Sequence, residues 1–430
     1  MIYLQFIVLL IMLSFLLILE RNTLASPSII CLAVFTISTL FAAAYKNKWD
    51  YDYSADAFLW ILGLLVLFCI IELIIDYFSR NINGYGTISY GIKNDELLEV
   101  SNGKIIFLVI AMAVMTIIYY RLVNSLSIQY GNRLGGLWRV IYYSRQAQVH
   151  GNMSLPYGAS LMSSICRDIA YFFLYILIHN RVIYHEKIRM KYIVPILMWL
   201  PISVLTGGRT SYIYFVAFGI VSFLVVYQKT YTINDAFITK FVMRLIPIFI
   251  AFLLLFNFVG RLKVSGVDQS PLDHIAKYVG FSIPGFSYFL RDGWTSNTYF
   301  GQTTLNRIYS ITNTLGITNI QTSSRFLPFI RLPGGEESNI YTAFARYLND
   351  FGAFGTIFII IVMAIFYGIY KNAIFKSNTS NLQIMLYASF IWPLSLISIE
   401  ENFLNELVST TSIYMLIIFC ILNKFLFGKK

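Results

Sequence analysis

Residues 2–19 read IYLQFIVLLIMLSFLLIL and contain no charged side chain. An apolar helix of about 20 residues is long enough to cross the hydrocarbon core of a bilayer. Lipid tolerates only segments that satisfy their own backbone hydrogen bonds, and a continuous apolar run does so as a helix rather than as an alternating barrel strand. The segment has neither a basic start nor a cleavage-site pattern, so we interpret it as a retained membrane span.

Similar apolar runs recur along the whole chain. Hydrophobic residues make up 57% of the 430 residues and charged residues only 12%, which is about half the charge of an ordinary soluble domain. We therefore expect an all-α polytopic membrane protein with about 11 transmembrane helices. The expected spans are residues 2–19, 27–45, 55–78, 104–123, 156–180, 192–206, 211–228, 242–260, 351–370, 382–399 and 407–423.

One long polar stretch interrupts the apolar runs and divides the chain into three parts. Residues 1–260 are expected to form a transmembrane bundle of about eight helices, with an external segment at 124–155. Residues 261–350 are expected to form a large external loop. Residues 351–430 are expected to form the C-terminal transmembrane helices.

Lysine and arginine predict the orientation, because short loops rich in these residues stay in the cytoplasm. The segment 181–191 and the C-terminus are basic, and Lys371 and Lys376 flank another short loop. Placing these regions in the cytoplasm leaves the long polar stretch outside. The segment 124–155 then also lies outside, although its arginines favour the opposite side.

The outer side of this topology is rich in arginine. It holds 11 arginines and four lysines, whereas the cytoplasmic side holds five arginines and 11 lysines. Only arginine has a planar fork that binds phosphate or carboxylate through two hydrogen bonds. The excess therefore indicates an anionic ligand on the outer side, the alternative being arginines that snorkel at the interface and pair with nearby acids.

A tight turn between two expected spans carries the first motif, Gly207-Gly208-Arg209-Thr210-Ser211. Glycine allows the positive φ angles that a short hairpin needs. The start of the following helix favours an anion. Arg209 is therefore a candidate phosphate-binding residue, and the alternative is an ordinary hairpin with an interfacial arginine.

The second motif lies where the long outer loop enters the next span. Residues 339–355 read NIYTAFARYLNDFGAFG. In a helix, Arg346 and Asp350 lie four residues apart on one face and can form an ion pair. Gly352 and Gly355 are expected to let another backbone approach closely. The alternative is a capped, well-packed helix start.

These two motifs, in this order and on this many spans, resemble the Wzy-type O-antigen polymerases, also called oligosaccharide repeat-unit polymerases. The resemblance rests on the Gly-Gly-Arg-Thr turn, and more firmly on Asn-x-Tyr-Thr followed by Arg-Tyr-x-x-Asp-Phe-Gly-x-x-Gly after a large outer loop. Arg261 at the end of a preceding span also fits. The resemblance implies a metal-independent membrane glycosyltransferase of the C-type superfamily that needs no cofactor.

The resemblance also implies the substrates and the location. These are an undecaprenyl-diphosphate-linked oligosaccharide donor and acceptor, joined into O-antigen or capsular polysaccharide on the outer face of the bacterial cytoplasmic membrane. Membrane lipid and a chain-length regulator protein are the other expected partners. The net charge of +11 is spread over many loops, so nothing favours a nucleic-acid partner.

A flippase for the same lipids and an O-antigen ligase are the alternative functions. A flippase is expected to concentrate ionisable residues in the lumen of its bundle, whereas this chain places them in external loops. Ligases use a histidine in the large loop. The only histidine there, His274, has no matching surroundings, which disfavours the ligase.

Site roles follow from the resemblance and from the chemistry of sugar transfer. The resemblance carries functional roles to Arg209, Arg261 and Arg346, whose charge would stabilise a leaving diphosphate. A carboxylate or histidine must accept the proton of the acceptor hydroxyl, and we expect Glu336 or Glu337 to do so, with Asp350 and His274 as alternatives. The expected substrate-binding residues are Gly207, Gly208, Arg139, Arg145, Tyr347 and Asp350. No metal ligand is expected, since the acidic pair Asp50 and Asp52 is a weak signal.

Overall fold

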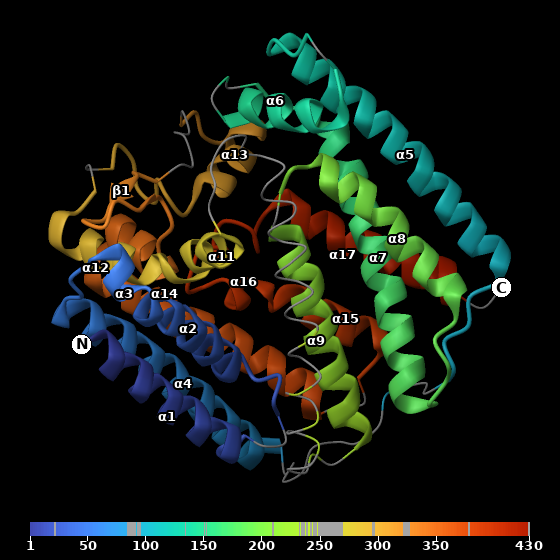
Figure 1. Ribbon diagram of the computed structural model, residues 1–430. Helices are drawn as coiled ribbons and strands as arrows, with labels where there is room; N and C mark the ends of the chain where they lie inside the picture. Colours follow the sequence, from blue (N-terminus) through green and yellow to red (C-terminus); the bar gives the residue numbers. More distant parts are fainter. Residues whose placement is uncertain are drawn as a thin grey trace. The chain divides into compact units, whose positions relative to one another are not determined.

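The computed structural model describes residues 1–20, 23–83, 92, 96–133, 135–149, 151, 153–208, 210–231, 233, 237, 240, 243, 247, 270–294, 297–320, 327–376 and 379–428. Within these residues the secondary structure is almost entirely helical (Figure 1). One small hairpin pairs β1 (Ile330–Arg331) with β2 (Glu337–Ser338). Eight described helices are long and apolar enough to cross a membrane. The chain is therefore an all-α, multi-pass membrane protein, as expected.

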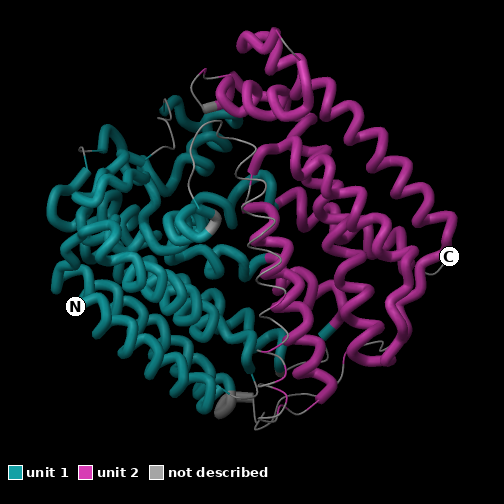
Figure 2. The backbone as a smooth tube through the Cα atoms, viewed as in Figure 1, with its two compact units in different colours: residues 1–89, 270–379, 390–412 teal, residues 90–269, 380–389, 413–430 magenta. Residues whose placement is uncertain are grey.

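The chain forms two compact units, which are coloured separately in Figure 2. The first unit comprises residues 1–89, 270–379 and 390–412, and the second comprises residues 90–269, 380–389 and 413–430. The helices of the first unit are α1 (Ile2–Leu19), α2 (Pro27–Ala44), α3 (Lys46–Trp49), α4 (Ala55–Asn83), α11 (Pro271–Gly280), α12 (Ser282–Asp292), α13 (Asn306–Thr314), α14 (Ala343–Lys376) and α16 (Trp392–Ser395). The helices of the second unit are α5 (Asn102–Gln129), α6 (Leu137–Val149), α7 (Tyr157–Ile183), α8 (Met190–Leu205), α9 (Thr210–Thr230), α15 (Asn381–Phe390, whose last residue belongs to the first unit) and α17 (Thr410–Phe427, whose first residues up to Ser412 belong to the first unit).

Eight of the expected spans correspond to helices that can cross a membrane, namely α1, α2, α4, α5, α7, α9, α14 and α17. The expected span at 192–206 corresponds to α8, an apolar helix of only 16 residues that contains Pro195 and Pro201. The expected span at 242–260 lies outside the described part of the chain.

The expected span at 382–399 is wrong as a single helix, because α15 ends at Phe390 and α16 is separate. Pro393 has no N–H to continue the helical ladder and restricts the residue before it. The N–H of Leu394 bonds within the new turn. The carbonyl of Phe390 instead accepts a hydrogen bond from the Tyr367 hydroxyl at 3.0 Å.

In the first unit, α14 packs along α4, and α2 packs against both α1 and α4. The described helices of the expected outer loop, α11 and α12, pack on α2, and α12 also contacts α4 and α14. Gly280 permits this approach, since a Cβ there would lie 2.8 Å from the backbone nitrogen of Ala42. A Cβ on Gly285 would lie 2.7 Å from the carbonyl oxygen of Ile340. The described part of the long polar stretch is therefore folded onto the helices rather than extended away from them.

In the second unit, α7 packs against α5, α8 and α9, and α5 also packs against α6 and α8. The hydroxyl of Tyr175 on α7 donates to the side-chain carbonyl of Asn381 on α15 at 2.7 Å. Phe172 on α7 meets Phe419 on α17 edge to face at 6.1 Å. α7 is therefore the central helix that holds the other elements of this unit.

A bend interrupts α14 near its start. The helix begins at Ala343, before the expected span, and Gly352 has φ 65° and ψ −171°. This backbone region is open essentially to glycine alone. A Cβ on Gly355 would collide with the side chain of Phe351, whereas nothing lies within 4 Å of a Cβ on Gly352. Gly352 thus supplies a backbone conformation, not the close backbone approach that the motif predicted, and Gly355 makes room for Phe351.

We expect Gly352→Ala to lower the free energy of unfolding by about 1–3 kcal/mol, because alanine must adopt a strained backbone conformation. Gly63→Ala in α4 is the matched control, since nothing lies within 4 Å of its added Cβ and its φ is not positive. That change should be neutral or stabilising by up to about 1 kcal/mol, because alanine favours helix. Unfolding of both variants in one detergent measures the difference, and equal stabilities would contradict the role of Gly352.

Candidate functional site

The first turns of α14 carry three residues of the second motif, and all three are buried. Arg346 is 9% exposed, Asp350 is 8% exposed and Tyr347 is completely buried. The helix start is anchored by the N–H of Ala343, which donates to the carbonyl of Ile397 at 3.0 Å. The motif therefore lies inside the first unit and not on a free surface.

Asp350 holds a neighbouring loop of the first unit. Its Oδ2 accepts hydrogen bonds from the backbone N–H groups of Thr303 and Thr304 and from the Thr304 hydroxyl, each at 2.8 Å. Its Oδ1 accepts from the side-chain amides of Asn297 at 3.0 Å and Asn349 at 3.1 Å. Five donors occupy this carboxylate, so Asp350 organises the loop, and its expected contact with substrate stays a prediction.

Arg346 does not form the expected ion pair with Asp350, although both residues are described. Its Nη1 donates instead to the carbonyl oxygen of Thr303 at 2.9 Å. Its Nε is buried and has no hydrogen-bond partner among the described residues. A guanidinium has five N–H donors, and a buried donor without an acceptor is costly. Arg346 therefore keeps donor capacity for a further acceptor.

Glu401, which the sequence analysis did not select, completes the surroundings of Arg346. This residue is 1% exposed and accepts hydrogen bonds from the Tyr347 hydroxyl at 3.0 Å and from the backbone N–H of Leu404 at 2.6 Å. It also accepts from the side-chain amide of Asn405 at 2.8 Å. Its position in a polar turn between two apolar runs was the available signal in the sequence.

The same polar cluster joins three segments of the first unit. The side-chain amide of Asn405 donates to the carbonyl of Thr303 at 3.1 Å, so this oxygen accepts from both Asn405 and Arg346. Burial raises the pKa of Glu401 to about 6, although the bond from Leu404 and the charge of Arg346 act in the opposite direction. Tyr347 therefore positions Glu401 from inside the protein, and its expected contact with substrate stays a prediction.

We expect acid to stabilise the wild type relative to Glu401→Gln. The pKa of Glu401 is higher in the folded chain than its ordinary value of 4.5, so the folded state binds the proton more tightly. The resulting stabilisation is present below the ordinary pKa and is lost as the pH rises through about 6. It amounts to about 2 kcal/mol. Thermal unfolding of both proteins across this pH range measures it, and a pH-independent difference would contradict the burial of an ionisable Glu401.

The two expected proton acceptors lie on the hairpin of the first unit. Glu336 forms an ion pair with Lys277 of α11 at 2.5 Å. Glu337 is exposed on β2, opposite Arg331 in the strand pairing. No contact in the described part of the chain joins either glutamate to Arg346. The structure thus leaves Glu337 open to solvent and engages Glu336 in a salt bridge.

The second unit holds the other expected site residues. Gly207 has φ 64°, which confirms that the turn needs glycine there, and the N–H of Gly208 donates to the Thr206 hydroxyl at 3.2 Å. Arg139 and Arg145 are both exposed on α6. Arg209 and Arg261 lie outside the described residues.

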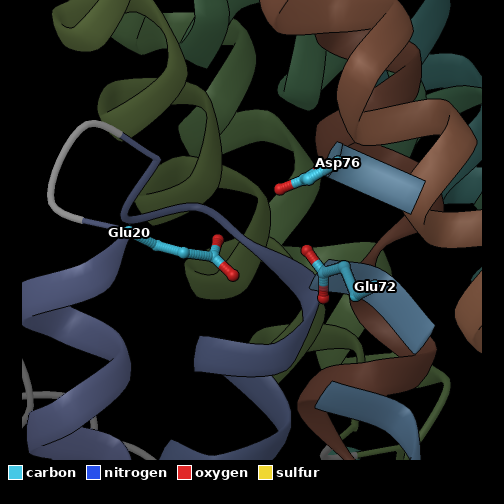
Figure 3. Close-up of side chains that lie close together, drawn as sticks. All are labelled: Glu20, Glu72 and Asp76. Atoms are coloured by element: carbon cyan, nitrogen blue, oxygen red, sulfur yellow. The ribbon is translucent and has the colours of Figure 1, made fainter. Parts of the chain in front are cut away.

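One group of acids in the first unit has the spacing of a metal site. Oxygen atoms of Glu20, Glu72 and Asp76 lie within 4.8 Å of one another, and the three side chains converge in Figure 3. The ammonium of Lys371 lies 2.5 Å from Glu72, 2.6 Å from Asp76 and 3.2 Å from Glu20. The N–H of Ser28 at the start of α2 also donates to Glu72 at 2.8 Å. Lys371 therefore supplies the cation for this group, which is a buried ion-pair network.

This network corrects the expected place of Lys371. The lysine is 1% exposed inside α14 and does not flank a short loop. A buried lysine that pairs with several acids connects neighbouring helices, and it says little about which side of the membrane a loop lies on.

No protein-family model matches the chain, and neither a curated protein nor a solved structure matches it. The family resemblance therefore stays a prediction that rests on the two motifs.

Proposed function

We propose that this chain is a membrane glycosyltransferase that polymerises oligosaccharide repeat units carried on polyprenyl diphosphate. The observation that supports it best is the buried guanidinium of Arg346, which donates one hydrogen bond to a carbonyl and none to a carboxylate among the described residues. A preorganised, desolvated positive charge stabilises an anion that develops during reaction. Asp350 and Glu401 fix the loop and the turn around Arg346, so little free energy is needed to orient its guanidinium during the reaction.

The proposed reaction breaks the bond between the anomeric carbon of the donor sugar and the oxygen of its diphosphate. That oxygen leaves with the bonding electrons, so negative charge grows on the diphosphate, where arginine can bind it through two hydrogen bonds. The acceptor hydroxyl oxygen forms the new bond to the anomeric carbon and loses its proton to a base. Glu337 is the base that we favour for this proton, because its side chain is exposed, whereas Glu336 forms an ion pair with Lys277.

We further propose that the start of α14 faces the outside of the bacterial cytoplasmic membrane. The basic segment 181–191 and the basic C-terminus support this orientation. The acceptor repeat and the growing chain, both bound to undecaprenyl diphosphate, would then meet at the outer surface. A chain-length regulator protein would act on the same complex.

Cells that lack the protein test this function. We expect their surface glycan to carry at most one repeat unit, because transport and attachment of single repeats do not need a polymerase. Restoration of the polymer by the wild-type gene is the control. Loss of every repeat, with lipid-linked units retained on the inner leaflet, would indicate a flippase instead.

A further inference from the structure

Three helices of the second unit enclose a small polar cavity. Its volume is about 80 Å³, and its lining includes Ser163 and Arg167 of α7, Ser203 near the end of α8 and Ser211 near the start of α9. Ser164, Trp199 and Thr206 complete the wall, so five of the seven lining residues carry a hydroxyl. Such a wall offers hydrogen bonds beside the apolar ring of Trp199.

The hydroxyls differ in how far they are already engaged. Ser203 donates to the carbonyl of Leu200 at 2.8 Å, and Thr206 donates to the carbonyl of Ser203 at 2.7 Å. The hydroxyls of Ser163 and Ser164, inside α7, form no hydrogen bond with any other described residue. These two serines precede Arg167 by four and three positions and therefore share its face of α7. Their hydroxyls can bond a guest without breaking an existing contact.

Two features of the wall favour an anionic guest. The guanidinium of Arg167 lies in the wall and is oriented by Asp168, with Nε and Nη2 at 2.9 Å and 2.8 Å from the same carboxylate oxygen. Asp168 balances the charge of Arg167, so the guanidinium contributes N–H donors and little net potential. α9 begins at Thr210, beside Ser211, and a helix start supplies positive potential that favours an oxyanion over a neutral sugar.

Resting on the polymerase function proposed above, we propose that this cavity is a binding subsite for one phosphate group of a prenyl diphosphate, formed by Ser163, Ser164 and Arg167. One water-sized group needs roughly 10–15 Å³ of cavity volume. The cavity of about 80 Å³ therefore admits the five non-hydrogen atoms of one phosphate. The cavity adjoins the Gly207-Gly208 turn through Thr206 and Ser211. None of its three key residues belongs to the motifs that suggested the family.

Binding to the purified full-length protein in phosphatidylcholine nanodiscs tests the subsite. The probes are farnesyl diphosphate, inorganic pyrophosphate and inorganic phosphate, each titrated by calorimetry. We expect the double variant Ser163→Ala/Ser164→Ala to bind at least about tenfold more weakly than wild type, because hydrogen bonds to a charged group are lost. Arg167→Lys keeps a charge beside Asp168 but loses the planar fork and should show a similar loss.

Ser222→Ala on α9 is the control, because this serine is buried in the same unit and does not line the cavity. Loss confined to farnesyl diphosphate assigns the subsite to a lipid diphosphate, and equal loss for all probes assigns it to phosphate in general. Wild-type protein that binds none of the probes, or folded serine variants with unchanged affinity, would overturn the subsite. If binding depends on these serines but the wild-type protein makes no polymer, the proposed polymerase function is overturned and the subsite stands.

Discussion

We expect Arg346→Lys to lower polymerisation by roughly 30- to 1,000-fold, which corresponds to about 2–4 kcal/mol of barrier. Lysine keeps the charge but lacks the fork that can bind Thr303 and a diphosphate at the same time. Arg346→Ala should be at least as inactive. The measurement is polymer formation at matched membrane levels of each protein.

Arg291→Lys is the matched control for this change. Arg291 lies in the same unit but is 59% exposed, and it forms an ion pair with the adjacent Asp292 at 2.8 Å and lies over the ring of Tyr288 at 4.2 Å. We expect its replacement to leave polymerisation within about twofold of wild type, because exposed ion pairs contribute little. Near-normal polymer formation by Arg346→Lys would contradict simultaneous binding of Thr303 and the diphosphate by Arg346. Arg209 and Arg261 would then remain as the proposed ligands of the diphosphate.

We expect Lys371→Met to lower the free energy of unfolding by about 3–5 kcal/mol, because it leaves buried carboxylates without their counter-charge. The three acids around this lysine are 0–11% exposed at their side chains. Adding Glu20→Gln and Asp76→Asn to Lys371→Met should recover part of the loss, since fewer charges then remain unpaired. Denaturant unfolding in one detergent measures all three proteins.

Lys48→Met is the control for the buried network. Lys48 also pairs with an acid, Asp273 at 2.6 Å, but its side chain is 55% exposed. Its loss should cost no more than about 1 kcal/mol. Equal losses of stability at Lys48 and Lys371 would contradict the view that burial gives the network its energy. A triple variant that is less stable than Lys371→Met alone would contradict the view that unpaired carboxylates cause the loss.

The transmembrane helices were predictable because their signal is local. Residues 2–19 carry no charge, and lipid leaves a helix as the available backbone solution. Hydropathy failed at 382–399 because it counts apolar side chains and ignores that Pro393 stops the hydrogen-bond ladder. The positive φ of Gly207 was predicted from its place in a short turn. Gly352 was predicted to allow a close backbone approach, because residue spacing alone does not reveal a bend in a helix.

The surroundings of Arg346 were not predictable in the same way. Asp350 lies at an ideal helical distance for an ion pair, yet the loop before α13 supplies four better-placed donors and Asn349 supplies a fifth. Thr303 is 43 residues before Arg346, and Glu401 comes from the turn before α17. Which segments return to a helix start depends on the packing of the whole unit, so the motif could indicate the site but not its neighbours.

Purified protein supplied with polyprenyl-diphosphate-linked repeat units tests the polymerase function most directly. We predict a ladder of lipid-linked products that differ by one repeat, formed by the wild type and by Arg291→Lys and strongly reduced for Arg346→Lys. Folded wild-type protein that leaves the repeats unjoined, while intact lipid-linked units remain in the sample, would contradict the proposed function.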